Sequence, residues 1–405
     1  FIFDVAGCCI FYKNKNVMYY HFGYINSCVA KSILNMISPT LNYEAGHIAS
    51  LPIITEKDML SPVNELVEKN IILSKADWDS FDISWDFQHH PLLRKTPTII
   101  EAFKQWKNEC DTRFEQLRTN EEQLNRIFID IYGLQDEITP EVEDKDITVR
   151  KADLSRDIRS FMSFAVGCMF GRYSLDEDGL IYAGGEWNSN KYKTFIPDVD
   201  NCIPITDEEY FTDDIVGLFV EFVKAVYGSD TLEENLDFIA NALGNKGDTS
   251  REVIRNYFQK DFYADHLKVY QKRPIYWLFD SGKQNGFKAL IYMHRYDADT
   301  VGRVRTDYLH RAQKYVETAM ESAQYTINNA SSASEKSKAT KAVTKYTKQL
   351  AEMKIYDEAI AHIANKRLEI DLDDGVKVNY EKFQGVEVAQ EGKKTLKVDL
   401  LAKMK

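Results

Sequence analysis

Apolar residues recur every three or four positions over a long stretch that begins at Thr98. The repeat contains Ile99, Phe103, Trp106, Cys110, Phe114, Leu117, Leu124, Phe128 and Ile131, and Glu121 is its one gap. This spacing predicts an amphipathic helix of about 35 residues, roughly 50 Å long at 1.5 Å per residue. A helix of this length is too long to be covered by the hydrophobic core of one small domain. We therefore expect it to lie along a partner helix or to bridge two domains.

A second helical pattern covers residues 299–365 and is divided by the polar segment 328–336. Two long helices joined by a short polar turn are typical of an antiparallel helical hairpin. We expect this hairpin to be a packing element. The apolar face of its second helix contains Val343, Tyr346, Leu350, Met353, Ile360 and Ile363.

Strand patterns occur in short, separate runs. Residues 1–12 and 17–25 are rich in β-branched and aromatic residues and are parted by the polar sequence KNKN, which predicts a hairpin. Residues 179–197 are typical of a strand, a glycine-rich loop and a second strand. Residues 274–281 and 287–296 flank the sequence GKQNG, whose residues suit a hairpin turn.

Shorter helices are predicted from their start and stop signals. One helix has Asn26 or Ser27 as its cap and Pro39 as its stop, and another starts at the pair Ser61-Pro62. A third covers residues 153–173 and ends near Gly171. A fourth covers residues 248–270, with Asp248, Thr249 or Ser250 as its cap.

Together these patterns predict an α+β fold of mixed helices and short antiparallel β-hairpins. The charged segment 136–150 contains a proline and indicates a domain boundary. We divide the chain into residues 1–60, residues 61–150 as a helical spacer with the long helix, residues 151–298 as an α+β region, and residues 299–405 as the helical hairpin with a short β tail.

Composition narrows the class of protein. The chain has 405 residues and a formal net charge of −12. No apolar run reaches the roughly 18 residues of a membrane span, and no secretory signal is present. None of the six cysteines forms a CxxC pair, so we expect reduced core cysteines and a cytoplasmic protein. The chain opens with an apolar run that lacks methionine, so we expect it to be a part of a longer protein.

Signatures of common catalytic sites are missing from the sequence. It has no glycine-rich dinucleotide loop, no P-loop, no HExxH and no GxSxG. Adjacent residues on a helix or strand point in different directions, so His89 and His90 are poor partners for one metal ion. We therefore expect neither a catalytic residue nor a metal site in this chain.

Residues 272–314 gather positive charge in a chain that is otherwise acidic. The window has nine Lys or Arg against four acids, a net +5. A local field can attract a polyanion against the sign of the net charge, and cations that contact phosphates release counterions. The window therefore predicts DNA contacts, to which His294 adds a partial charge. The candidates are Lys272, Arg273, Lys283, Lys288, His294, Arg295, Arg303 and Arg305. The alternative is that these cations lie on solvated faces and pair with local acids.

The loop 184–193 is a second candidate for DNA contact. Its candidate residues are Trp187, Asn188, Lys191 and Lys193, because amide and ammonium groups bond base edges. The alternative is an ordinary polar loop whose tryptophan folds inward. The stretch 198–240 holds twelve acids and one lysine. It is a solvated face, a docking face for a basic partner, or a region that repels DNA.

Several long strings in the chain are distinctive. They include SPTLNYEAGHIASLPI, DWDSFDISWDFQHHPLL, IYGLQDEITPEV, FAVGCMFGRYSLDEDGLIYAGGEW and KRPIYWLFDSGKQNGFKALIYMHRYDADTVGRVRTDYL. Together they resemble the C-terminal part of the PglX family, the adenine-specific DNA methyltransferases of BREX phage-exclusion systems. These enzymes are related to single-chain restriction–modification methyltransferases. The resemblance covers nearly the whole chain.

The resemblance implies a DNA-recognition and accessory role, with residues 1–60 as the end of a target-recognition region. The family carries its S-adenosylmethionine loop and its Asn-Pro-Pro-Tyr-type motif upstream, and neither occurs here. No catalytic residue is carried over, and we expect this chain alone to be inactive and to need no cofactor. The parent enzyme would use S-adenosylmethionine to methylate adenine N6 in double-stranded DNA.

Two alternatives remain open at this point. The chain is a scaffold that docks other BREX proteins or a phage inhibitor that mimics DNA, or it is a self-contained nuclease. A nuclease needs a metal-binding carboxylate cluster, and no spacing in the sequence indicates one.

Overall fold

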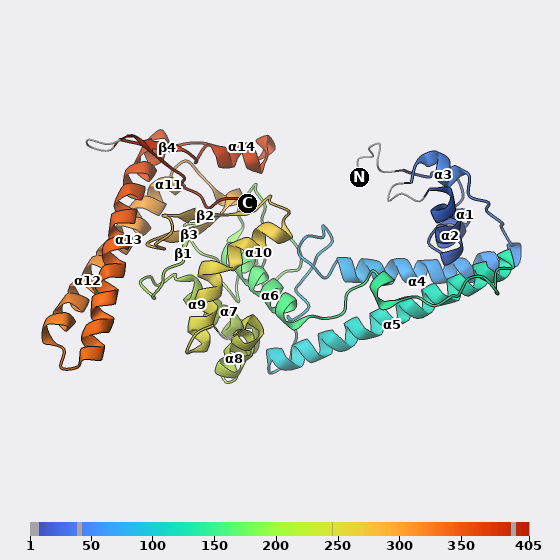
Figure 1. Ribbon diagram of the computed structural model, residues 1–405, viewed down its shortest axis with the longest axis horizontal. Helices are drawn as coiled ribbons and strands as arrows, with labels where there is room; N and C mark the ends of the chain where they lie inside the picture. The colour runs from blue at the N-terminus through green and yellow to red at the C-terminus, as the bar shows by residue number, and fades with distance from the viewer. Residues whose placement is uncertain (1–7, 39–42, 245, 390–393, 405) are drawn as a thin grey trace. The chain divides into compact units, whose positions relative to one another are not determined.

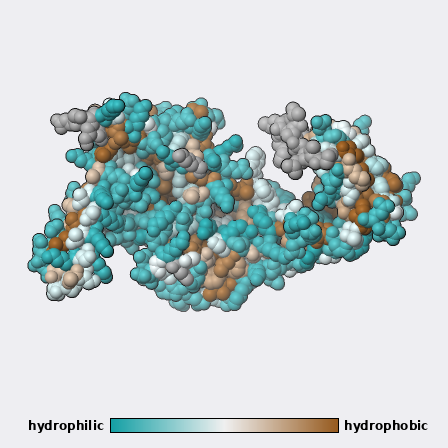
Figure 2. Space-filling view, viewed as in Figure 1, coloured by the Kyte–Doolittle hydropathy of each residue, from teal (hydrophilic) through white to brown (hydrophobic). Residues whose placement is uncertain are grey.

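The computed structural model describes residues 8–38, 43–244, 246–389 and 394–404 (Figure 1). Its internal contacts divide the chain into two units, each with its own hydrophobic core. Unit 1 contains Phe1–Ser84 and Lys104–Asp153, and unit 2 contains Trp85–Phe103 and Leu154–Lys405. The face in Figure 2 is mostly hydrophilic, with small, separate apolar patches. In the part of the chain that the structure describes, no helix has both the length and the apolar character of a membrane span.

Unit 1 is built from helices, and its core forms where they meet. The helices are α1 (Lys15–Ile25), α2 (Cys28–Ile37), α3 (Ala45–Ala49), α4 (Leu60–Trp78) and most of α5 (Ile99–Tyr132). Tyr20 and Tyr24 of α1 pack edge-on against Phe128 of α5, with ring centroids 5.4 and 5.5 Å apart. Gly23 lets α4 come close, because a Cβ at this position would lie 2.9 Å from Val67.

The predicted hairpin near the N-terminus is wrong. Residues 8–12 form no strand, and α1 covers the whole of the second apolar run, while residues 1–7 lie outside the described residues. Aromatic side chains favour strands by propensity, but Tyr20 and Tyr24 are one helical turn apart and are both fully buried. Their packing against α5 outweighs the intrinsic preference.

Helix starts follow the predicted caps in part. Ser27 caps α2, as predicted, and accepts a hydrogen bond from the Ala30 N–H at 3.4 Å. Pro39 lies outside the described residues. The helix α4 begins at Leu60, so Ser61-Pro62 lies inside its first turn, and the predicted cap there is wrong.

The long helix is confirmed as α5, which has 34 residues. Figure 1 shows α4 running beside it, and the Asn120 amide of α5 donates to the Asn70 amide oxygen of α4 at 2.8 Å. The partner helix that the length of α5 required is therefore α4. Short 3₁₀ turns elsewhere in the chain span Lys57–Met59, Asp144–Asp146, Ser189–Lys191, Met293–Arg295 and Leu372–Asp374.

Unit 2 has a small antiparallel sheet as its centre. The strands are β1 (Ile203–Pro204), β2 (Tyr276–Asp280) and β3 (Lys288–Tyr292), in the order β1-β3-β2. β2 pairs with β3 in an antiparallel register that places Leu278 opposite Leu290. The predicted hairpin over 274–296 is confirmed, and the α+β class with it.

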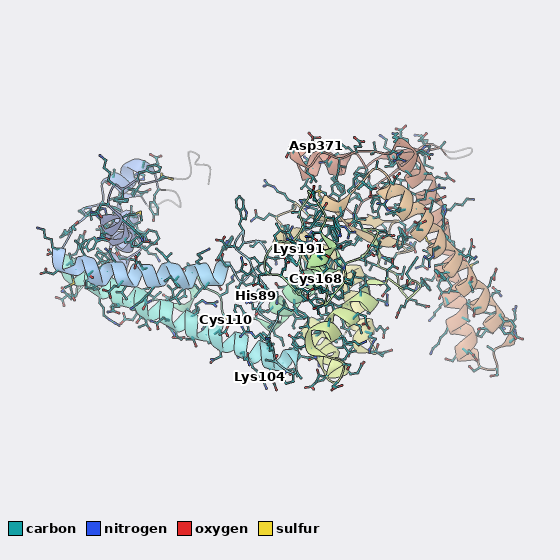
Figure 3. All side chains as sticks on the ribbon, turned by 180° about the vertical axis from the view of Figure 1, so that it is seen from behind. His89, Lys104, Cys110, Cys168, Lys191 and Asp371 are labelled. Atoms are coloured by element: carbon teal, nitrogen blue, oxygen red, sulfur yellow. The ribbon has the colours of Figure 1, made fainter. Side chains whose placement is uncertain are left out.

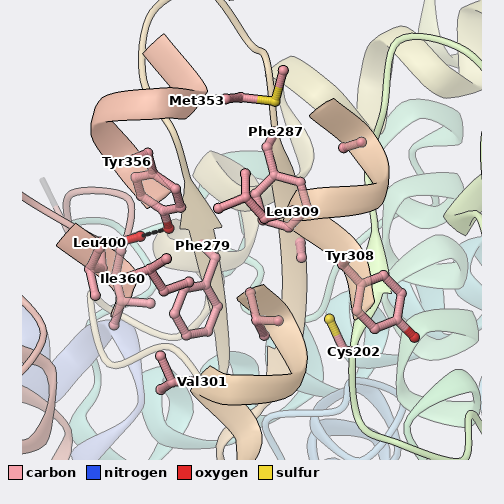
Figure 4. Packing of buried hydrophobic residues seen from close by; sticks show 14 of the residues in the cluster. Cys202, Phe279, Phe287, Val301, Tyr308, Leu309, Met353, Tyr356, Ile360 and Leu400 are labelled. Carbon is pink, nitrogen blue, oxygen red and sulfur yellow. Dashed lines mark hydrogen bonds between the residues drawn. The ribbon is translucent and has the colours of Figure 1, made fainter. Parts of the chain in front are cut away.

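Both faces of this sheet are covered. Trp277 and Phe279 of β2 belong to the core that also holds buried residues of the α12–α13 hairpin. Figure 4 shows Phe279 in this core, where the Tyr356 hydroxyl donates to the Leu400 carbonyl at 2.6 Å. On the other face, Tyr276 stacks on Phe170 with ring centroids 5.4 Å apart. The helices that lie wholly in unit 2 and precede β2 are α6 (Leu154–Met169), α7 (Ile215–Tyr227), α8 (Leu232–Leu243), α9 (Ser250–Lys260) and α10 (Phe262–Val269).

The C-terminal helical hairpin is confirmed. A continuous helical segment consists of α11 (Thr300–Arg303), a π-helical turn (Val304–Leu309) and α12 (His310–Asn329), and α13 (Ala333–Lys366) returns beside α12. The tail consists of α14 (Val376–Glu381) and the antiparallel strands β4 (Val386–Val388) and β5 (Leu396–Val398).

Two predictions inside unit 2 need correction. The helix predicted over 248–270 is broken at Asp261 into α9 and α10, and Thr249 is its cap. Residues 179–197 form no strands. In this segment the Asp176 carboxylate accepts the backbone N–H groups of Lys193 and Thr194 at 2.7 and 2.9 Å. A side chain therefore satisfies donors that a strand would have paired with a neighbouring strand.

Candidate nucleic-acid interface

Many cations of the basic window are engaged inside the fold. Lys288 donates to the Gln259 carbonyl at 3.0 Å, and its side chain is only 11% exposed. Arg303 pairs with Asp297 at 2.8 Å. Arg305 forms two hydrogen bonds to the Asp357 carboxylate, at 2.7 and 3.2 Å. For these residues, the alternative interpretation applies, in which the cations pair with local acids and do not contact DNA.

Three other candidate cations of the window are exposed. Lys272 and Arg273 follow α10, and Lys283 lies in the turn between β2 and β3. In the described part of the chain, none of the three has a carboxylate at ion-pair distance. The basic surface of this window is therefore smaller than the count of charges implies.

The structure joins the window to the loop 184–193. The Arg295 guanidinium lies 4.6 Å from the centre of the Trp187 ring, which also stacks on Tyr192 at 5.0 Å. A Cβ on Gly171 would lie 2.3 Å from the Trp187 ring, so only glycine admits the indole there. Trp187 is thus packed on one side although it is 40% exposed.

The other candidates of this loop have local roles. The Asn188 side chain accepts the Asn190 N–H at 3.1 Å, and the Lys191 ammonium lies 3.5 Å from Glu177. Lys193 is exposed. Lys191 is labelled among the side chains of unit 2 in Figure 3.

Arg172, which no sequence pattern singled out, lies among tyrosines behind this loop. Its guanidinium donates to the hydroxyls of Tyr173 and Tyr292 at 3.1 and 3.3 Å. Among the described residues, no carboxylate lies at ion-pair distance from it. A half-buried guanidinium without a counter-ion favours binding of an anion, because desolvation of the charge is otherwise uncompensated.

Two histidines near Arg172 are neutral. Burial, with Arg172 as a second cause, lowers the pKa of His266 to about 3 and that of His294 to about 4. His266 Nε2 accepts the N–H groups of Ile275 and Tyr276 at 3.1 and 3.2 Å, so Nδ1 carries its proton. That Nδ1 is buried without a partner. The expectation that His294 adds a partial positive charge is therefore wrong.

The exposed cations Lys272 and Arg273 border the same cluster. The ring centroids of Tyr270 and His266 are 4.7 Å apart, and Tyr270 also interacts electrostatically with the Arg172 guanidinium. The next two residues, Gln271 and Lys272, have φ of 50° and 60°. Two successive non-glycine residues in the left-handed region are strained by about 1 kcal/mol or more each, and such strain is concentrated at functional sites. We call this surface the Arg172 face: Arg172, Trp187, Tyr270, Lys272, Arg273, His294 and Arg295. Tyr292, which accepts a hydrogen bond from Arg172, is fully buried and is not part of it.

Several acids of the stretch 198–240 are also engaged. Asp214 caps α7 and accepts two hydrogen bonds from Arg255, at 2.6 and 2.9 Å. Arg251 pairs with Glu233 at 2.6 Å. Fewer acids of this stretch are therefore free to dock a basic partner than the sequence alone indicates. Among the described residues, no group of three or more His, Cys, Asp or Glu is placed to hold a metal ion.

Unit 1 contains a cavity of about 480 Å³, which explains the gap in the pattern of α5. Glu121 lines it, and burial, followed by the charge of Asp146, raises the Glu121 pKa to about 7. Asn125, which also lines it, is already bonded to the Cys28 N–H and the Pro140 carbonyl.

Comparison with known proteins identifies the family. No family model matches the chain. It is 47% identical over 393 residues to the adenine-specific methyltransferase PglX of Lacticaseibacillus casei (strain Zhang), covering 95% of this chain and 32% of that protein. It is 34% identical over 414 residues to the adenine-specific methyltransferase BrxX of Escherichia coli O9:H4 (strain HS), covering 95% of this chain and 34% of that protein. The predicted resemblance is confirmed, and the chain spans about a third of the length of these curated relatives. The chain therefore belongs to the PglX family of adenine-specific methyltransferases.

Proposed function

We propose that this chain is the C-terminal part of a BREX adenine-specific DNA methyltransferase and holds duplex DNA while an upstream domain methylates adenine N6. An enzyme that reacts with a base must extrude it from the stack, so another part has to grip the duplex. The parent enzyme would take its methyl group from S-adenosylmethionine. The residues of this chain do not fit that cofactor, because the sequence lacks a glycine-rich loop for it.

The observation that carries this proposal is the Arg172 face. Arg172, which has no carboxylate at ion-pair distance among the described residues, belongs to this face together with the exposed Lys272 and Arg273 and the partly exposed Trp187. Cations beside aromatic rings suit a nucleic acid, since the cations contact phosphates and the rings stack on sugars or bases. Phosphate contacts of this kind position a duplex without reading its sequence.

The test is fluorescence anisotropy of the full-length enzyme with labelled duplex DNA at several salt concentrations. Neutralising two phosphate contacts in Lys272→Gln/Arg273→Gln should weaken binding about tenfold and reduce the salt slope by about 1.8. The matched control is Lys336→Gln/Lys354→Gln, which removes the same charge from exposed positions of α13. Equal affinity and slope for wild type and the Lys272/Arg273 variant would contradict the proposed role of this face.

The rival role is a protein-interaction scaffold. A DNA-mimicking inhibitor would compete with DNA for the Arg172 face, whereas other BREX proteins would bind without competition. The pairing of Asp214 with Arg255 and of Glu233 with Arg251 leaves the acidic stretch less suited to a basic partner. We therefore favour the DNA role, and we expect this chain alone to transfer no methyl group from labelled S-adenosylmethionine.

A further inference from the structure

The first half of α13 carries a second basic surface, which the basic window does not include. Between residues 336 and 354 the helix has six lysines and one acid. Four of them, Lys338, Lys341, Lys345 and Lys348, are spaced by three, four and three residues and are all exposed. At 3.6 residues per turn this spacing aligns them on one side of the helix over about 15 Å. We call these four residues the lysine stripe.

The lysines of the stripe are largely unpaired within the described part of the chain. In the described part of the chain, Lys338, Lys341 and Lys348 have no carboxylate at ion-pair distance. Lys345 is the exception, because it pairs with Asp207 from the segment after β1. Glu208, the next acid in that segment, lies near Tyr346 and faces the same part of α13.

The turn between β2 and β3 adds Lys283 to this surface. The Glu352 carboxylate, one helical turn beyond Lys348, accepts the Ser281 hydroxyl at 2.9 Å and the Gln284 N–H at 2.8 Å. Its charge is thus used to hold the turn. A Cβ on Gly286 would lie 2.9 Å from Met353, so the glycine allows the turn to rest directly on α13. Lys283 itself is exposed.

The chemistry of this surface fits a phosphate backbone better than a protein. Among the described residues of α13, no large apolar side chain is exposed, whereas protein interfaces have apolar or aromatic residues at their centre. A row of exposed lysines, of which Lys338, Lys341 and Lys348 form no ion pair among the described residues, suits phosphates, and 15 Å corresponds to about four base-pair steps at 3.4 Å. A chain of net charge −12 repels DNA elsewhere, so such a row also orients the duplex.

We propose that the lysine stripe and Lys283 form a second contact surface for the phosphate backbone of duplex DNA, in addition to the Arg172 face. This inference rests on the proposed DNA-holding function. It assigns to the helical hairpin a binding role beyond packing.

The experiment compares two variants of the full-length enzyme that lose the same charge from opposite sides of α13. Lys341→Gln/Lys348→Gln removes two lysines of the stripe, and Lys336→Gln/Lys354→Gln removes two that lie about 160° around the helix from it. We expect the stripe variant to bind labelled duplex about tenfold more weakly, with a salt slope reduced by about 1.8, and the control to bind like wild type. Lys341→Arg/Lys348→Arg should restore binding, because it keeps the charge.

The outcomes separate this inference from the proposed function. If the Lys272/Arg273 variant weakens binding and the stripe variant does not, the stripe is no DNA surface while the proposed function stands. Equal losses in the stripe and control variants would show an effect of net charge only and would also overturn the inference. If wild type does not bind duplex DNA at all, the proposed function itself fails. A stripe variant that keeps its DNA affinity but loses an acidic protein partner would assign the surface to protein binding instead.

Discussion

The guanidinium of Arg295 lies over the indole of Trp187, with its central carbon 4.6 Å from the ring centre. The same guanidinium donates to the carbonyls of Phe170, Asp198 and Val199 at 3.3, 2.8 and 3.0 Å. One side chain therefore ties the loop 184–193 to the end of α6 and to the segment before β1. The arginine predicted to contact DNA acts first as an anchor of the loop.

Trp187→Ala should loosen this loop. The variant loses the cation–π contact and the stacking on Tyr192, together about 1–2 kcal/mol of local stability. We expect faster proteolysis near Gly184 and Gly185 than in wild type. Trp85→Ala is the matched control, because Trp85 is fully exposed, at 102% of its reference area. Equal cleavage rates in the two variants would show that the indole does not anchor the loop.

Arg305→Gln should lower stability without changing the salt dependence of DNA binding. Arg305 forms two hydrogen bonds to Asp357, which also bonds His310 at 2.8 Å. Loss of this partly buried pair should cost about 1–2 kcal/mol in denaturant unfolding. A double-mutant cycle with Asp357→Asn measures the coupling. A lower salt slope in Arg305→Gln with stability unchanged would instead make Arg305 a phosphate contact.

Asp198→Asn should stabilise the protein above neutral pH. Burial, followed by the charge of Asp200, raises the pKa of Asp198 to about 7. A carboxyl whose folded pKa is raised contributes its full stability below its unfolded pKa of about 3.9, and that contribution is lost as the pH rises through about 7. Asparagine keeps the acceptor for the Cys202 N–H, which lies 3.2 Å from Asp198, and cannot ionise.

The measurement is the difference in melting temperature between Asp198→Asn and wild type as a function of pH. We expect a gain at about pH 8 and little or no gain at about pH 4.5. A difference that does not change with pH would mean that the ionisation of Asp198 does not matter to folding.

Gly282→Ala should destabilise the turn that rests on α13. Gly282 has φ of 135°, and a Cβ there would lie 2.7 Å from the Glu352 carboxylate. Gly184→Ala is the control, because Gly184 also has positive φ, at 107°, but has open space around it. Both variants carry backbone strain of about 1 kcal/mol, and only Gly282→Ala also displaces Glu352. Equal unfolding free energies would show that the turn does not depend on close contact with α13.

Long periodic segments were predictable because their pattern reports which side of a helix is buried. The apolar repeat from Ile99 predicts α5, and the apolar residues from Val343 to Ile363 predict α13. The alternating and aromatic residues around GKQNG predict the β2–β3 hairpin. Short segments were not predictable in this way. Residues 8–25 and residues 179–197 have strand-like composition, yet contacts with distant segments decide their conformation.

The α+β class, the long helices, the central hairpin, the family and the total charge of the basic window could all be predicted from the order of the amino acids. Where that charge is free depends on contacts that form only in the folded chain. Arg303 and Arg305 pair with Asp297 and Asp357, while Arg172 bonds tyrosines and, within the described part of the chain, has no carboxylate at ion-pair distance. The physical reason is that a charge acts through its nearest neighbours, and in this fold those neighbours come from positions up to 120 residues away in the chain.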